Sequence, residues 1–349
     1  MVKLRYVTES TAVLVFTPVN RRYLTGFPSS LGFLLITKSE NILFVDSRYF
    51  EAAQNKAKDV KVVLLKNIYE QLNEVLNKEN IKKLYIETEN EISLYKSLKS
   101  RLDVKIVPSD SLSARLLDLR SVKTKQELEN IITAQRIAEK AFDDILDFIK
   151  VGVTEKQIAA TLDYKMLLLG AEKPAFDSIV VSGVNSSMPH GVPSDKKIEK
   201  GDFITMDFGA MYQGYCSDMT RTVCVGFATD EMKRVYNTVL SAQKASETLV
   251  TSGADCAEVD KGARDVIEEA GYGEFFGHGT GHGIGLFVHE RPTISPKSKN
   301  IKLRAGQIIS NEPGIYLPKK FGVRIEDMLF VKKNGCKNLT KTPKDLIIL

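Results

Sequence analysis

The chain of 349 residues has no tryptophan and only four cysteines, with no CxxC spacing among them. This pattern excludes a disulfide-stapled mini-protein and offers no thiolate metal motif, so we expect buried free thiols. The longest uncharged apolar stretches, such as residues 31–37, fall far short of the roughly 20 residues that cross a bilayer. Residues 1–10 lack the apolar core of a signal peptide. We therefore expect a cytoplasmic protein without a membrane partner.

The chain also has only a small excess of positive charge. The net charge is +5, and the excess lies in residues 1–120, which hold 19 basic and 14 acidic side chains. These basic residues alternate with acids and do not cluster with aromatic residues, which predicts a solvated surface and no nucleic-acid partner. Apolar residues make up 43% of the chain, as in globular proteins, and the length favours two domains.

The order of predicted elements changes near residue 121. Residues 31–107 alternate β-branched strand patterns with amphipathic helical patterns, which predicts an α/β domain. Thr124 and Glu127 then form a capping-box pattern at the start of a long helix, and the order helix, helix, strands occurs twice. We expect an N-terminal domain at 1–121 and a second domain at 122–349, with two halves around one central sheet.

Acidic residues interrupt apolar strand patterns in the second domain. A hairpin centred between Tyr212 and Gln213 would place Asp207 opposite Asp218, with Cβ atoms about 4.5–5.5 Å apart. Two solvent-facing acids are the alternative interpretation, but the apolar neighbours of Asp207 on both sides fit it poorly. Two further acids, Glu312 and Glu326, also follow short segments that contain apolar residues. Buried carboxylates must be paired, protonated or metal-bound.

All four histidines lie in the same part of the chain. They are His190, His278, His282 and His289. The segment 278–282 has the spacing of a helical zinc site but lacks the glutamate of HExxH and contains two glycines, so it is not a zincin helix. The alternating glycines of 277–285 contain no dinucleotide fingerprint and indicate close backbone approach.

Four carboxylates together with His282 would balance the formal charge of two divalent cations. A mainly oxygen-donating set suits Mn²⁺ or similar ions better than thiolate-preferring ones. Paired cations of this kind lower the pKa of water and polarise a carbonyl group. The residues therefore predict a dinuclear metal site.

Seven ordered motifs resemble those of the pita-bread metallopeptidases, most closely the Xaa-Pro aminopeptidases and Xaa-Pro dipeptidases. They are Pro189–Gly191, Met206–Ala210, Ser217–Thr222, His278–Gly285, Val288–Pro292, Glu312–Tyr316 and Val323–Asp327. Asn20–Phe27 and Leu43–Tyr49 are similar to the creatinase-type N-terminal domain of proline-specific members. The resemblance covers essentially the whole chain. It implies an α/β and α+β fold: a creatinase-like N-terminal domain followed by a pita-bread catalytic domain.

The resemblance also implies a ligand set and a reaction. Asp207 would bind one metal ion, Asp218 and Glu326 would bridge two, and His282 and Glu312 would complete the second site. The ions would be Mn²⁺ or Co²⁺, with Zn²⁺ also compatible. A bridging hydroxide would attack the peptide carbonyl before a proline at the second position of the substrate. Relatives are commonly homodimers, so we expect one here.

Other residues receive roles from the same resemblance. Glu312 would shuttle the proton, and His289 would stabilise the oxyanion or the scissile amide. His190 and His278 would line the substrate pocket. Arg324 would orient a metal-binding carboxylate, bind a substrate carboxylate, or form a structural ion pair. Candidates for the pocket of the proline ring are Phe176, Tyr316 and the region of Phe287.

Three alternatives stay open. A creatinase-like hydrolase without metal and a binding module on the same fold would both have lost metal ligands, whereas all five are present here. The third is a dipeptidase. Some dipeptidases carry an arginine shortly after the His-Glu-x-Pro motif, but Thr293 follows Pro292 in this chain. The sequence therefore favours an aminopeptidase slightly.

Overall fold

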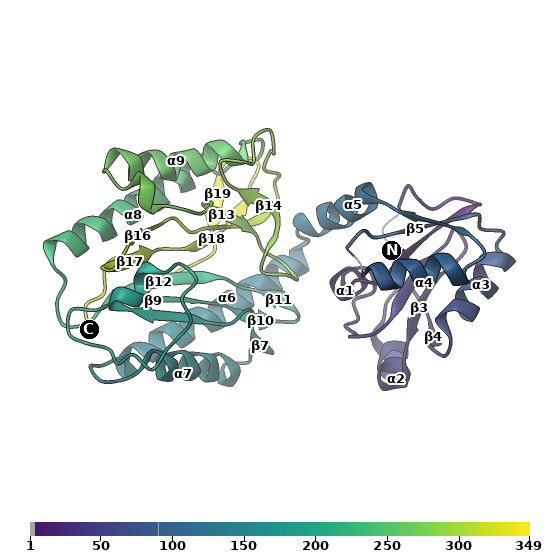
Figure 1. Cartoon of the computed structure of the whole chain (residues 1–349), viewed down its shortest axis with the longest axis horizontal. Helices are drawn as coiled ribbons and strands as arrows, with labels where there is room; N and C mark the ends of the chain where they lie inside the picture. Colours follow the sequence, from purple (N-terminus) through teal and green to yellow (C-terminus); the bar gives the residue numbers. More distant parts are fainter. Residues whose placement is uncertain (1–3, 90) are drawn as a thin grey trace. The chain divides into compact units, whose positions relative to one another are not determined.

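The structure is a computed structural model that describes residues 4–89 and 91–349. The chain divides into two compact units, Met1–Arg120 and Ser121–Leu349 (Figure 1). The four cysteines are free, and three of them are buried, as expected. Within the described residues, no helix is both long and apolar enough to cross a membrane.

The first unit is a six-stranded sheet with helices on both faces. Its strand order is β4-β3-β2-β1-β5-β6, with parallel and antiparallel neighbours. The strands are β1 (Thr11–Val15), β2 (Phe33–Ile36), β3 (Asn41–Val45), β4 (Lys61–Leu64), β5 (Lys83–Ile86) and β6 (Lys105–Pro108). The helices are α1 (Pro18–Thr25), α2 (Ser47–Lys56), α3 (Ile68–Lys78), α4 (Ile92–Arg101) and α5 (Asp110–Ser121). One apolar core joins the sheet to α1, α2 and α5, and a second joins it to α3 and α4. This architecture confirms the predicted α/β fold.

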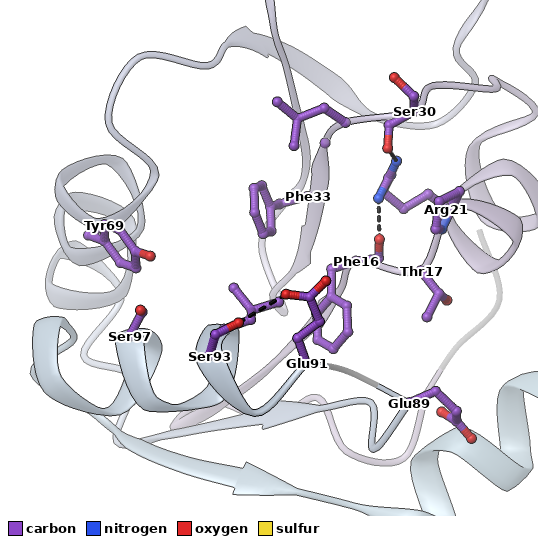
Figure 2. Close-up of a pocket in the computed structure, with 14 residues that line it drawn as sticks. Phe16, Thr17, Arg21, Ser30, Phe33, Tyr69, Glu89, Glu91, Ser93 and Ser97 are labelled. Atoms are coloured by element: carbon purple, nitrogen blue, oxygen red, sulfur yellow. Dashed lines mark hydrogen bonds between the residues drawn. The ribbon is translucent and has the colours of Figure 1, made fainter.

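A cavity of about 510 Å³ lies in this first unit (Figure 2). Phe16, Phe33 and Tyr69 line it together with Arg21. The Arg21 side chain is only 2% exposed. It donates hydrogen bonds to the backbone carbonyl oxygens of Phe16 and Ser29. Its guanidinium group therefore serves the fold by linking the segment before α1 to the turn after it.

The second unit has sheets between two pairs of helices (Figure 1). The helices are α6 (Lys125–Ile145), α7 (Glu155–Leu168), α8 (Asp230–Leu249) and α9 (Cys256–Glu269). The strands that frame the site are β8 (Ile179–Ser182), β9 (Phe203–Phe208), β10 (Ala210–Tyr212), β11 (Tyr215–Cys216), β12 (Met219–Cys224), β13 (Gly281–Gly283), β14 (Glu290–Ile294), β15 (Ile308–Asn311), β16 (Gly314–Leu317), β17 (Phe321–Arg324) and β18 (Asp327–Val331). The short strands β7 (Lys173–Pro174) and β19 (Cys336–Asn338) lie at sheet edges. The repeated order of helices and strands confirms the prediction, whereas the expected single sheet is divided into four.

Strand β9 is buried on both faces, as its apolar composition predicts. Ile204, Met206 and Phe208 pack into the core that contains α6 and α7. Phe203 points the other way, into the core that contains α8 and α9. Because side chains alternate along a strand, Asp207 shares the face of Phe203 and is directed between the two helical layers. The capping box of Thr124 and Glu127 at the start of α6 is also present.

The hairpin register differs from the prediction. Tyr212 pairs with Tyr215, so the turn is centred between Gln213 and Gly214, and Asp207 lies opposite Thr220 instead of Asp218. Both turn residues have positive φ angles, 48° and 76°. A two-residue turn of this type follows the twist of the strands and favours glycine, which is why the turn includes Gly214. A shift of one residue at the turn moves the pairing by two.

A buried arginine joins the C-terminal segment to the centre of the second unit. Arg221 on β12 forms an ion pair with Asp327 at 2.8 Å, and both side chains are at most 2% exposed. Arg221 also donates to the backbone carbonyl oxygens of Glu326 at 2.6 Å and Thr342 at 2.7 Å. Lys344 approaches the other oxygen of Asp327 at 2.7 Å. Arg221 therefore fixes the backbone at Glu326 through its carbonyl oxygen.

Replacing Arg221 with methionine should destabilise the protein by about 3–5 kcal/mol, because it leaves buried acceptors without their donor. The exposed pair of Lys140 and Asp144 on α6 provides the control. The Lys140→Met variant should cost no more than about 0.5 kcal/mol. Denaturant unfolding of the two variants measures both effects, and equal stabilities would contradict the role of Arg221.

Candidate metal centre

Three of the four candidate carboxylates lie in short breaks between strands. Asp218 lies between β11 and β12, Glu312 between β15 and β16, and Glu326 between β17 and β18. The backbone N–H of Glu312 donates to Thr280 at 2.8 Å, and that of Glu326 donates to Thr220 at 3.1 Å. The breaks at Glu312 and Glu326 are thus each fixed by a hydrogen bond to another part of the unit, which orients these two segments.

His282 lies between two of these carboxylates. Its Nε2 atom is 3.3 Å from Glu312 Oε1 and 3.6 Å from Asp218 Oδ2. Its Nδ1 atom is 3.1 Å from the carbonyl oxygen of Gly283. That contact favours a proton on Nδ1 and leaves Nε2 to face the carboxylates, as a metal-binding histidine requires. Asp218, His282 and Glu326 each offer one ligand atom, and these three atoms lie within 4.8 Å of one another.

The buried acids of the centre lie so close together that a bound cation would stabilise their charged forms. Burial and the neighbouring Glu326 raise the pKa of Asp218 well above its ordinary value, and burial and Glu312 do the same to the pKa of Glu326. Against the effect of burial, the hydrogen bond to His282 lowers the pKa of Glu312 to about 2. Asp207 Oδ1 and Glu326 Oε1 are buried without a hydrogen-bond partner among the described residues. Buried carboxylate oxygens left in this way fit divalent cations.

Arg324 is bound to Asp207. Its Nη2 atom donates to Asp207 Oδ2 at 2.6 Å, and its Nη1 atom donates to the hydroxyl of Tyr316 at 2.8 Å. Its Nε atom donates to Thr220 Oγ1 at 3.1 Å. Of the roles considered for Arg324, this geometry favours orientation of a candidate metal-binding carboxylate. Tyr316 is itself buried, which raises its pKa to about 12.

The other candidate histidines surround this centre at different depths. The rings of His289 and His282 have centroids 4.4 Å apart, and His289 itself is exposed. His278 Nε2 is 2.9 Å from the hydroxyl of Tyr316. Burial is the main cause of the lowered pKa values of His278 and His289, and the nearby His190 lowers both further. All nine candidate site residues therefore belong to one neighbourhood in the second unit.

Two hydroxyl groups that the sequence reasoning missed orient the carboxylates. Thr220 Oγ1 donates to Glu326 Oε2 at 2.7 Å. Ser310 Oγ lies 3.1 Å from Glu312 Oε1 and accepts from the backbone N–H of His282 at 3.0 Å. The alternation of Asp218 and Thr220 along one chain segment was the available signal for Thr220. Ser310 lies two residues before Glu312, but its contact with His282 comes from another strand and leaves no local signal.

The glycines around the histidines permit close backbone approach, as predicted. A Cβ atom on Gly281 would lie 2.1 Å from the carbonyl oxygen of Ser310, and one on Gly283 would lie 2.2 Å from that of Arg291. A Cβ atom on Gly277 would meet nothing within 4 Å. Strand β13, which carries His282, can therefore lie against its neighbours only without side chains at these positions.

Comparison with known proteins agrees with this geometry. Residues 129–333 match metallopeptidase family M24, and residues 8–122 match the creatinase/prolidase N-terminal domain. The chain belongs to metallopeptidase family M24. This match confirms the predicted fold, a creatinase-type domain followed by a pita-bread metallopeptidase domain, and the expected enzyme class. The match favours neither the metal-free hydrolase nor the binding module.

Relatives of this M24 chain cover nearly its whole length. It is 40% identical to the Xaa-Pro dipeptidase of Pyrococcus furiosus over 336 residues, which are 96% of this chain and 94% of that protein. A solved Xaa-Pro dipeptidase from Bacillus anthracis matches with a TM-score of 0.93 and 41% identity, covering 97% and 95% of the two chains. A solved X-Pro aminopeptidase from Thermotoga maritima matches with a TM-score of 0.92 and 39% identity, covering 97% and 98%.

The Gly281→Ala variant should lose metal affinity by at least about 10-fold, because the added methyl group must displace β13 or β15 and with it His282. Gly277→Ala is the matched control and should bind metal like the wild type. Calorimetric titration of chelator-treated protein with Mn²⁺ measures both. Wild-type affinity for Mn²⁺ in Gly281→Ala would show that metal binding does not need the close approach of β13 to β15.

Metal-free protein should become less stable as the pH rises from about 5 to 8. The raised pKa values of Asp218 and Glu326 mean that the folded state keeps protons that the unfolded chain releases near pH 4, so the free energy of unfolding falls with rising pH. Bound cations favour the charged carboxylates, so their stabilising effect should grow with pH and their binding should release protons. Thermal unfolding with and without Mn²⁺, and calorimetry in buffers of different ionisation enthalpy, test this. Proton uptake on metal binding would contradict it.

Proposed function

We propose that this chain is a dinuclear-metal-dependent Xaa-Pro aminopeptidase, which cleaves the bond between an N-terminal residue and a following proline. The observation that carries the proposal is the pair of buried carboxylate oxygens, Asp207 Oδ1 and Glu326 Oε1, which have no hydrogen-bond partner among the described residues. The names of the relatives, Xaa-Pro dipeptidases and an X-Pro aminopeptidase, support the substrate class. In this proposal residues 1–121 form the N-terminal domain and residues 122–349 the catalytic domain.

The proposed ligands are the four buried carboxylates and one imidazole. They are Asp207, Asp218, His282, Glu312 and Glu326. Two divalent cations bound there supply Lewis acidity and lower the pKa of water. The mainly oxygen-donating set suits Mn²⁺ or Co²⁺ and is also compatible with Zn²⁺.

The side chains around the ligands have the chemistry that peptide hydrolysis requires. The carboxylate of Glu312 accepts a proton from the attacking water and returns it to the departing proline nitrogen. His289, at the exposed rim, donates a hydrogen bond to the carbonyl oxygen as negative charge develops. His190 and His278 line the substrate pocket.

Proline at the second position suits a site of this kind. An Xaa-Pro amide has no N–H to donate, and the ring fixes the backbone angle φ. A site that activates the carbonyl through charge needs no such donor. Among the candidates for the ring pocket, Phe287 is 56% exposed, whereas Tyr316 is 6% exposed and its hydroxyl is bound to Arg324 and His278. The difference in exposure favours Phe287 over Tyr316, and Phe176 stays a candidate.

The contacts of Arg324 support an aminopeptidase over a dipeptidase. A strict dipeptidase needs a cationic group for the free carboxylate of its substrate. Arg324 is 3% exposed and directs its guanidinium to Asp207, Thr220 and Tyr316, and Thr293 offers no charge after Pro292. Xaa-Pro dipeptidase is the alternative function. The homodimer and the cytoplasmic location remain predictions.

Metal removal should abolish cleavage, and Mn²⁺ or Co²⁺ should restore it. We expect an Xaa-Pro-Yaa tripeptide to be cleaved faster than an Xaa-Pro dipeptide, and a Met-Ala-Yaa peptide not to be cleaved. Asp207→Asn and Glu326→Gln should each lose bound metal and at least about 100-fold in kcat/KM, because each removes a ligand charge. Peptide hydrolysis with metal analysis of the same samples measures both.

Asp265→Asn is the matched control, because this exposed carboxylate on α9 pairs with Lys261. It should keep wild-type activity and metal content. Preferred cleavage of the dipeptide would make the protein a dipeptidase. No cleavage of any peptide, with no bound metal, would support a binding module instead.

A further inference from the structure

A partly buried ion pair on α9 contacts the segment that leads into His282. Asp260 and Arg264 are one helical turn apart, and Arg264 Nε lies 2.9 Å from Asp260 Oδ2. The Asp260 side chain is 1% exposed, and the Arg264 guanidinium lies over the ring of Phe276 at 4.3 Å from its centroid. Neither side chain is among the proposed metal ligands.

The remaining hydrogen bonds of this pair go to residues 276–280. Arg264 donates to the carbonyl oxygens of Phe276 and His278, each at 2.9 Å. Asp260 Oδ1 accepts from both the backbone N–H and the hydroxyl of Thr280, each at 2.9 Å. Four hydrogen bonds from two side chains thus fix a segment of five residues that ends two positions before His282.

This segment is also connected to Glu312. The carbonyl oxygen of Thr280 accepts from the backbone N–H of Glu312 at 2.8 Å. Beyond it, Ser310 Oγ contacts the backbone N–H of His282 and a carboxylate oxygen of Glu312. A displacement of Thr280 would therefore shift the backbone at His282 and at Glu312 together.

We propose that Asp260 and Arg264 are positioning residues for the metal centre, which hold His282 and Glu312 at the separation that cation binding needs. The inference rests on the proposed metal-dependent function. Outer residues that orient metal ligands typically change metal affinity or activity by about 10- to 100-fold when replaced. Arg264 is suited to the task because its planar fork reaches one carboxylate and two carbonyl groups at once, which a lysine ammonium on a flexible stem does not reproduce.

The same helix offers a matched control. Lys261 and Asp265 form an ion pair of the same spacing on α9, but their side chains are 59% and 45% exposed. Replacing Lys261 removes a salt bridge from the helix without touching residues 276–280. The two pairs therefore separate positioning of the metal centre from a general loss of helix stability.

The test is titration of chelator-treated, full-length protein with Mn²⁺, with the dissociation constant from calorimetry and the electron paramagnetic resonance spectrum recorded at saturation. The variants are Asp260→Asn, Arg264→Met, Arg264→Lys and Lys261→Met. We expect the first three to raise the Mn²⁺ dissociation constant about 10- to 100-fold and to weaken the spectral signature of a coupled manganese pair. Lys261→Met should stay within about 2-fold of the wild type.

Folding is controlled in two ways. Each variant is titrated below its own unfolding temperature, and Thr280→Val removes only the hydroxyl bond to Asp260 while keeping the side-chain shape. This variant should raise the dissociation constant by at least about 3-fold. Wild-type affinity and spectrum in folded Asp260→Asn and Arg264→Met would overturn the inference, and wild-type behaviour of Arg264→Lys would overturn the role of the fork. If the wild type itself bound no Mn²⁺, the proposed function would fail instead.

Discussion

Mutual repulsion among buried carboxylates is the constraint on which the second unit depends. Asp218 and Glu326 lie in an apolar interior where burial and neighbouring acids disfavour their charged forms. The chain offsets part of this cost internally, through Arg324 on Asp207 and His282 on Glu312. The oxygens that remain without a partner are the ones that a bound cation would satisfy. Stability and metal binding in this unit therefore share one electrostatic origin.

The convergence of these side chains follows from interrupted strands. Within a continuous strand, side chains alternate between two faces, so an acid there is confined to one of them, as Asp207 is on β9. Breaks of two residues release Asp218, Glu312 and Glu326 from that alternation. Backbone hydrogen bonds from Glu312 to Thr280 and from Glu326 to Thr220 then fix two of these breaks. Three of the four acids therefore lie where the expected central sheet is divided into smaller sheets.

Much of this could be predicted from local patterns, and the failures have physical causes. The acid of β9 stands out because its neighbours are apolar, and the α6 capping box needs only residues three apart. The hairpin register was wrong because Gln213 adopts a positive φ angle, which residues other than glycine, asparagine and aspartate adopt less often. The pair on α9 was missed because its sequence spacing is also that of the exposed Lys261 pair. Only tertiary packing distinguishes the Asp260–Arg264 pair from the Lys261–Asp265 pair.

The charge balance of the proposed centre bears on how it treats a substrate. Four carboxylates neutralise two divalent cations, so Arg324 adds one positive charge that this ligand set does not cancel. Because Arg324 is buried and bound to Asp207, that charge is fixed in place and screened little by solvent. A fixed positive charge favours the negative charge that develops on the carbonyl oxygen during hydrolysis. The same contact with Asp207 occupies the guanidinium of Arg324, and this is why we propose, rather than a dipeptidase, an enzyme that acts on longer peptides.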